Sequence, residues 1–147
     1  MLYTGENRGK IQFRDRKQQI MDFSGMRYSN VTPTDVDMFF EKTDKAFVFA
    51  EIKYGNAKMP DGQKKAMTRL IDALQDSGRE AVFFLCKHFV SDTDEDVDVS
   101  KSTVVSIYYK REWLEQSQLN TLRESCNDFL KKALNGNIFI EEDYPLN

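Results

Sequence analysis

The sequence predicts an α/β fold, with one mixed β-sheet flanked by helices, and three observations support it. The chain has 147 residues, 40% of them hydrophobic, which suits a single domain spanning 1–147 with a real core. Residues 81–86 form a short apolar run, typical of a strand buried on both faces. Residues 61–78 repeat apolar side chains at helical spacing. Mixed elements of this kind pack as layers around one sheet.

The first third of the chain is expected to hold a helix and three strands. Residues 8–23 are rich in helix-tolerant side chains and run into Ser24-Gly25, which predicts a helix ending there. Three strands should follow, at 26–31, 37–41 and 46–54. The last of these is dense in Phe and Val and gives the clearest strand signal. The polar residues 42–45 predict a turn between the last two strands.

The rest of the chain predicts two helices and two further strands. The helix at 61–78 has Asp61 as its candidate N-cap and Gly78 as its stop. The later elements are expected at 81–86 (strand), 102–109 (strand) and 117–134 (helix), with a short edge strand in the tail 138–147.

Composition excludes several classes of protein. Two cysteines and one histidine are too few for the usual zinc sites. A net charge of −3 argues against a polybasic nucleic-acid coat. No apolar run approaches the roughly 18 residues of a membrane span, and the first residues lack the apolar core of a signal peptide. We therefore expect a cytoplasmic protein with no membrane partner, in which carboxylates hold any bound metal.

Charge is distributed unevenly along the chain. Two basic segments, 1–28 and 53–69, flank the acidic segment 29–52. This order could place a positive surface around a group of carboxylates. Ordinary solvated faces would give the same pattern, so charge alone does not decide between them.

The predicted hairpin brings carboxylates together. If residues 43–45 form a three-residue turn, Asp37 lies opposite Glu51 on the same face of the two strands. Two facing carboxylates repel, so they need a cation, a shared proton or solvent. Lys53 points to the same face as Glu51, two residues further on. Hard oxygen ligands with few protein donors suit Mg²⁺ or Mn²⁺.

A glutamine is expected beside these charges. Gln63 lies in the first turn of the predicted helix, on the face that also carries Met67, Leu70 and Leu74. That face should turn toward the sheet. The amide would then lie near the carboxylates, where it could orient a water, a lysine or a phosphate.

The residues 33–37 (Pro-Thr-Asp-Val-Asp), Glu51-Ile52-Lys53 and Gly62-Gln63 together resemble the PD-(D/E)XK nuclease superfamily. Over 22–63 the chain resembles, more narrowly, small phage or prophage proteins of this type. The resemblance covers about residues 5–110 and implies a core of helix, three strands, helix and strand. The extra strand and the C-terminal helix would follow that core.

The resemblance also implies roles. Asp37, Glu51 and the backbone carbonyl of Ile52 would bind Mg²⁺ or Mn²⁺, Lys53 would position or activate the attacking water, and Gln63 would assist. In the family the first acid often follows proline directly, whereas here Pro33 precedes Thr34-Asp35-Val36-Asp37. Asp35 therefore stays an alternative to Asp37. Some members use an acid on the first helix, for which Glu6 and Asp15 are the options.

The expected function is metal-dependent hydrolysis of DNA phosphodiester bonds, with low sequence specificity or structure selectivity. The alternative is a non-catalytic module that keeps the nuclease fold and binds nucleic acid or protein. Candidate phosphate contacts are Lys58, Lys64, Lys65, Arg69 and Arg14. Expected partners are DNA, a second copy of the chain and, for a phage protein, another phage component in the cytoplasm of the bacterial host.

Overall fold

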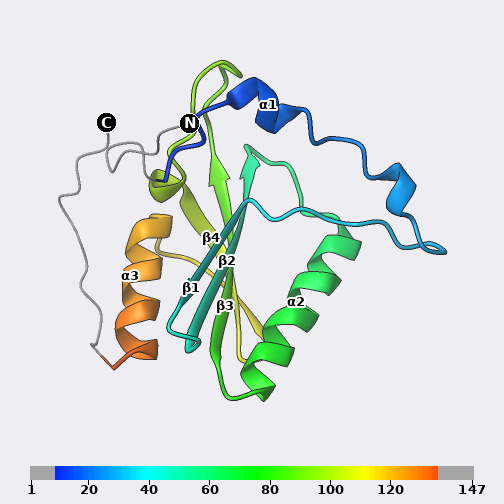
Figure 1. Cartoon of the computed structure of the whole chain (residues 1–147). Coiled ribbons are helices and arrows are strands. Elements are labelled where there is room, and N and C mark those ends of the chain that lie inside the picture. Colours follow the sequence, from blue (N-terminus) through cyan, green and yellow to red (C-terminus); the bar gives the residue numbers. More distant parts are fainter. Residues whose placement is uncertain (1–8, 136–147) are drawn as a thin grey trace. The chain divides into compact units, whose positions relative to one another are not determined.

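The computed structural model describes residues 9–135 (Figure 1). Contacts between residues group the chain into two compact units. The first comprises residues 1–34 with 141–147, and the second comprises residues 35–140. The second unit carries the whole β-sheet and both long helices.

The described part of the first unit contains little regular structure. The helix expected over residues 8–23 is shorter in the structure and comprises only α1 (Arg14–Gln18). The prediction of a strand over residues 26–31 is wrong. Its place is taken by the 3-10 turn η2 (Ser24–Met26) and a bridge between Tyr28 and Val31. The backbone N–H groups of Tyr28 and Val31 bond each other's carbonyls, so this segment pairs with itself rather than with a neighbouring strand.

Burial explains why the long helix does not form. The apolar side chains in this segment are exposed, among them Ile11, Ile20 and Met21. A short helix draws most of its stability from an apolar face packed on other elements. Since no residue of α1 is buried, that stabilisation is missing.

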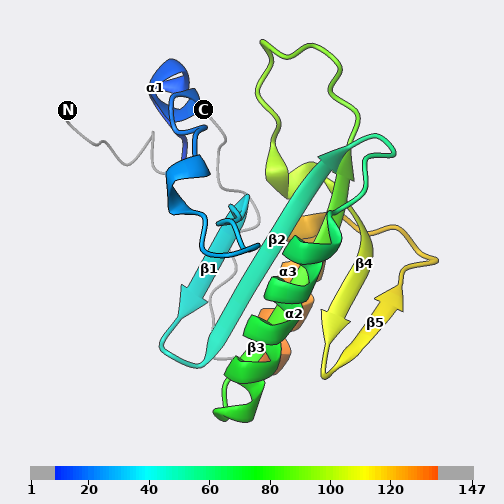
Figure 2. The ribbon, with the colours of Figure 1, turned by 90° about the vertical axis from the view of Figure 1, so that its right-hand side faces the viewer.

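The second unit is built on one five-stranded mixed sheet with the strand order β1-β2-β3-β4-β5 (Figure 2). The strands are β1 (Met38–Lys42), β2 (Ala46–Tyr54), β3 (Glu80–His88), β4 (Thr103–Tyr109) and β5 (Glu112–Glu115). Only β2 and β3 are parallel, and the other neighbours are antiparallel. The predicted α/β fold with a mixed sheet is confirmed, while β5 was not foreseen.

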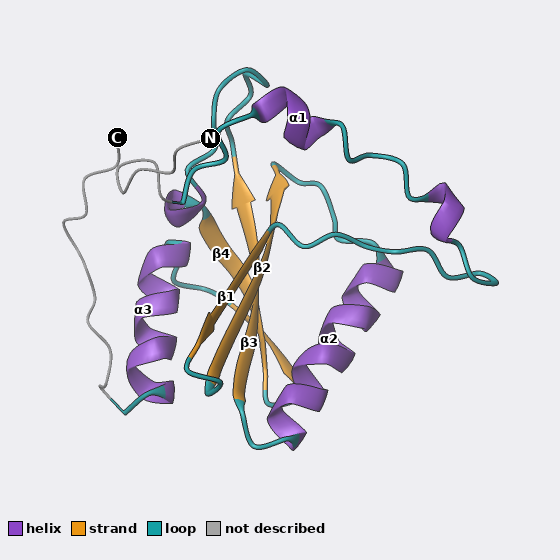
Figure 3. Cartoon of the chain, viewed as in Figure 1, coloured by secondary structure: helices purple, strands orange, loops and turns teal. Residues whose placement is uncertain are grey.

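One long helix covers each face of the sheet (Figure 3). Helix α2 (Asp61–Asp76) packs with β2 residue Phe49 and β3 residue Phe83, and helix α3 (Leu122–Ala133) packs on the other face with Val48 and Phe84. Successive residues of a strand point to opposite faces, so odd-numbered residues of β2 and β3 face α2. This parity places Glu51 and Lys53 on the α2 face.

Helix α2 ends at a glycine, as the sequence predicts. Gly78 has φ +90°, a backbone conformation that residues with a Cβ rarely adopt. The backbone N–H of Gly78 donates to the carbonyl of Gln75, and the backbone N–H of Arg79 donates to the carbonyl of Leu74. These two bonds satisfy carbonyls in the last turn of the helix. The helix start is shifted, since Pro60 is the N-cap and Asp61 is the first helical residue.

Two details of helix packing differ from expectation. Ile71 is fully buried, whereas Leu70 is exposed, so the face of α2 on the sheet runs through Gln63, Met67 and Ile71. Helix α3 begins at Leu122 rather than near 117, because Thr121 and Glu124 form a reciprocal capping box there. The predicted tail strand at 138–147 lies outside the described residues.

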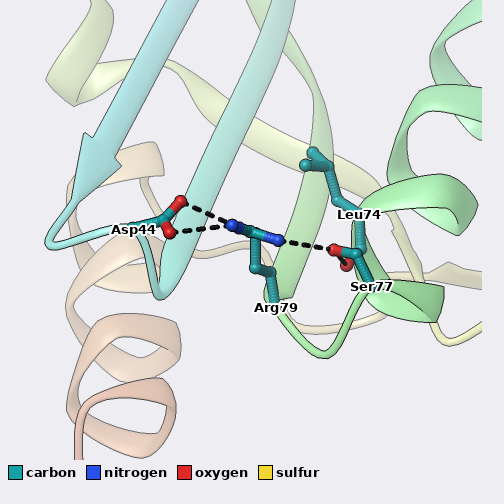
Figure 4. A network of polar contacts seen from close by, with 4 residues as sticks. All are labelled: Asp44, Leu74, Ser77 and Arg79. Atoms are coloured by element: carbon teal, nitrogen blue, oxygen red, sulfur yellow. Dashed lines mark hydrogen bonds and ion pairs between the residues drawn. The ribbon is translucent and has the colours of Figure 1, made fainter.

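The turn between β1 and β2 is held by an arginine (Figure 4). Thr43 and Asp44 both have positive φ, which is rare for side chains other than glycine. Arg79 donates two hydrogen bonds to the Asp44 carboxylate, at 2.8 and 2.7 Å, and a third to Ser77. The turn is therefore tied to the segment between α2 and β3.

No helix in the described part of the chain has the length and apolar content required to cross a membrane.

Candidate active site

The hairpin register predicted from the sequence is confirmed. Phe39 pairs with Phe49 and Glu41 with Phe47, as a turn at residues 43–45 requires. Asp37 immediately precedes β1, and the same register places it beside Glu51. The structure thus brings together the carboxylates of Asp37 and Glu51 at the C-terminal end of β2.

Glu51 is the centre of this cluster. Its side chain is buried, with the residue only 4% exposed. One carboxylate oxygen lies 3.2 Å from the Lys53 ammonium. The other oxygen accepts a hydrogen bond of 3.0 Å from the Gln63 amide. Both oxygens of the buried carboxylate therefore have a partner, as buried charge requires.

Gln63 joins three segments of the chain. It is the first buried residue of α2, and its amide nitrogen donates to the backbone carbonyl of Asp35 as well as to Glu51, each at 3.0 Å. The segment before β1, strand β2 and helix α2 are thereby fixed to one another. The expectation that this glutamine points toward the sheet is confirmed.

Asp37 lies just before β1 and contacts the edge of β2. Its carboxylate accepts a hydrogen bond of 2.8 Å from the backbone N–H of Ile52. The N–H and C=O of one strand residue leave the strand on the same side. The Ile52 carbonyl therefore points to the same edge as Asp37, where the resemblance places it as a metal ligand.

The cluster contains two acids and one lysine, and the lysine pairs with Glu51. Burial and, after it, the charge of Asp37 raise the pKa of Glu51 to about 7, although the Lys53 ammonium opposes both effects. When both acids are ionised, the cluster carries more negative charge than its single lysine balances.

This donor set fits a hard divalent cation in part. The carboxylates of Asp37 and Glu51 and the Ile52 carbonyl are oxygen donors of the kind that Mg²⁺ and Mn²⁺ prefer, and Mg²⁺ commonly keeps several waters. Among residues 9–135, no group of three or more His, Cys, Asp or Glu side chains is placed to hold a metal. An ion here would therefore use two carboxylates, a carbonyl and water.

The other predicted residues lie apart from this cluster or outside the described chain. Lys58, Lys64, Lys65 and Arg69 are exposed on α2 and the loop before it. The Lys64 ammonium already has a partner, because it lies 4.7 Å from the centre of the Trp113 ring. Arg14 belongs to α1 in the first unit, and Glu6 lies outside the described residues.

One contribution escaped the sequence analysis. Asp35 is an alternative carboxylate ligand by its sequence position, and its backbone carbonyl accepts a hydrogen bond from the Gln63 amide. Every residue type has a backbone carbonyl, so the sequence pattern could not indicate that this one accepts the hydrogen bond.

Comparisons with protein-family models, with curated proteins and with solved structures gave no match. The resemblance to PD-(D/E)XK nucleases thus stays a prediction from motif and placement.

Proposed function

We propose that this protein is a metal-dependent nuclease that hydrolyses DNA phosphodiester bonds with low sequence specificity. The observation that carries the proposal is the buried Glu51 carboxylate, held by Lys53 and Gln63 beside the second acid Asp37. Burial of an acid with a like charge next to it is unfavourable in the absence of a cation. Such arrangements are concentrated at functional sites.

Each side chain has a part in this proposal. Asp37 and Glu51, with the Ile52 carbonyl, would hold Mg²⁺ or Mn²⁺, which polarises a phosphodiester and lowers the pKa of bound water. Lys53 is about one quarter exposed, so its ammonium can reach a phosphate or water at the site surface. Gln63 positions Glu51, because its amide fixes one carboxylate oxygen. Lys58, Lys65 and Arg69 would contact the DNA backbone.

A specific observation also favours the alternative, a non-catalytic module that binds nucleic acid or protein. Glu51 already has a partner on each oxygen, so the cluster can exist as a closed ion-pair and hydrogen-bond network. Under this alternative, the polar cluster fixes the position of α2 on the sheet and binds no metal. The cluster consists of Asp37, Glu51, Lys53 and Gln63.

Cleavage assays separate the two functions. We would incubate labelled linear, nicked and branched DNA with the protein and Mg²⁺ or Mn²⁺, for wild type, Glu51→Gln and Lys53→Gln. The nuclease proposal predicts metal-dependent cleavage that both substitutions abolish. Glu41→Gln is the matched control for Glu51, because Glu41 is an exposed acid on the neighbouring strand.

Two results would contradict the proposal. Cleavage unchanged in both variants would identify a contaminating nuclease as its source. No cleavage of any substrate, with either metal, would favour the binding module. Circular dichroism of each variant would show that lost activity does not reflect lost fold.

A further inference from the structure

The parallel pairing of β2 and β3 places a second lysine beside the candidate active site. Lys87 of β3 is the direct neighbour of Lys53 of β2 in the strand register. Both have odd numbers in strands whose odd-numbered residues face α2. Lys87 therefore lies on the same face of the sheet as Glu51 and Lys53.

The two lysines differ in their partners. The Lys53 ammonium pairs with Glu51 at 3.2 Å. Within residues 9–135, no ion pair joins Lys87 to an acid. Neighbouring strands lie only about 4.8 Å apart, and like charges directly opposite each other are unfavourable. Lys53 is thus engaged by Glu51, whereas Lys87 has no acid paired with it among residues 9–135.

The position in the sheet also favours a ligand. Lys53 and Lys87 each lie one residue before the end of their strand, at Tyr54 and His88. In sheets with parallel strands, ligands commonly bind outside the carboxyl ends of those strands. Lys87 is partly exposed there.

We propose that Lys87, together with Lys53, binds a phosphate group of the nucleic-acid backbone beside the candidate active site. This inference rests on the proposed function and adds a substrate-binding residue to it. An anion between the two ammonium groups relieves their repulsion. It would also align the backbone past Glu51 and Asp37. The contact is to phosphate and carries no sequence preference, in agreement with low specificity.

Binding is the direct test, and it can be separated from cleavage. We would measure the affinity of a short fluorescent DNA duplex by anisotropy, with chelator present so that no cleavage occurs, at several salt concentrations. Lys87→Gln should weaken binding by roughly five- to tenfold. It should also reduce the slope of log K against log salt by about 1, the change for one lost phosphate contact.

Two further variants serve as controls. Lys131→Gln removes the same charge from an exposed position on α3, on the opposite side of the sheet, and should leave affinity and slope near wild type. Lys87→Arg should retain the salt slope, because the cation is kept. Equal melting temperatures would show that Lys87→Gln is folded.

The outcomes distinguish this inference from the nuclease proposal. Wild-type affinity and slope in Lys87→Gln would overturn the phosphate contact, even if metal-dependent cleavage were found. An equal loss in Lys131→Gln would also overturn it, since the effect would then be one of net charge. A loss specific to Lys87→Gln in a protein that cleaves nothing would support the phosphate contact and refute the nuclease.

Discussion

Two ion pairs lie at opposite ends of the parallel strands β2 and β3, and they differ in charge balance. At the start of the strands, Arg79 binds Asp44 in an exposed pair of one cation and one acid. Arg79 keeps the pKa of Asp44 below its usual value. At the other end, Lys53 pairs with Glu51, the second acid Asp37 lies beside Glu51, and the pKa of the buried Glu51 is raised to about 7.

The comparison shows that the two clusters differ in how completely their charges are paired. The Arg79–Asp44 pair is complete, and its bidentate geometry holds a turn in which Thr43 and Asp44 have positive φ. The cluster around Glu51 is unfavourable by itself, because burial and a neighbouring acid both oppose ionisation. A divalent cation would stabilise the second cluster and has no comparable role in the first.

The largest expected effect comes from neutralising Glu51 in the metal-free protein. Since the pKa of Glu51 is raised from 4.5 to about 7 on folding, ionisation destabilises the fold as the pH rises through this interval. Glu51→Gln removes that pH dependence. The free energy of unfolding of this variant, relative to wild type, should therefore rise as the pH increases from 5 to 8, by at most about 3 kcal/mol.

Urea unfolding at pH 5 and pH 8 with chelator present would measure this gain, with Glu41→Gln as the exposed control. A difference between Glu51→Gln and wild type that stays constant across the two pH values would mean that Glu51 ionises as an ordinary acid. The proposed difference in charge balance between the Arg79–Asp44 pair and the Glu51 cluster would then be refuted.

A smaller effect is expected from Gln63→Ala. This change removes both hydrogen bonds that fix Glu51 and Asp35 to α2, and it leaves a buried carboxylate oxygen without its donor. The free energy of unfolding should fall by roughly 1–3 kcal/mol. Urea unfolding would measure it.

Gln75→Ala is the matched control at the other end of α2. Among residues 9–135, the Gln75 amide donates one hydrogen bond, to the backbone carbonyl of Ala81 at 3.0 Å. Its loss should destabilise the protein less. Equal losses in the two variants would indicate that Gln63 acts only as a packing residue.

The smallest effect is expected from Arg79→Gln. The Arg79–Asp44 pair is exposed, so water and salt screen it. The variant should unfold slightly more readily than wild type at low salt, and the difference should shrink as NaCl is added. Melting curves at low and high salt would measure it. A large, salt-independent loss would mean that this pair supports the fold as strongly as the buried cluster does.

The sequence allowed prediction of the hairpin and of its cluster, because both follow from local rules. A three-residue turn fixes which residues face each other, and helical spacing turns Gln63 toward the sheet. The Thr121–Glu124 capping box was readable as well, and it would have corrected the start of α3.

Features that depend on the fold as a whole could not be predicted in this way. The segment 26–31 has the composition of a strand, yet none of the described strands pairs with it, and Tyr28 and Val31 bond each other. Lys87 acquires its place beside Lys53 only through the parallel register of two strands separated by α2. Such pairings depend on tertiary packing, which residue patterns do not encode locally.

The most direct test of the central claim, that Asp37 and Glu51 bind a divalent cation, is the melting temperature with and without Mn²⁺ or Mg²⁺. A ligand that binds only the folded state raises the melting temperature. Wild type and the control Asp44→Asn should both show this rise, and Asp37→Asn should show none. No rise in wild type, or an equal rise in Asp37→Asn, would contradict the metal site.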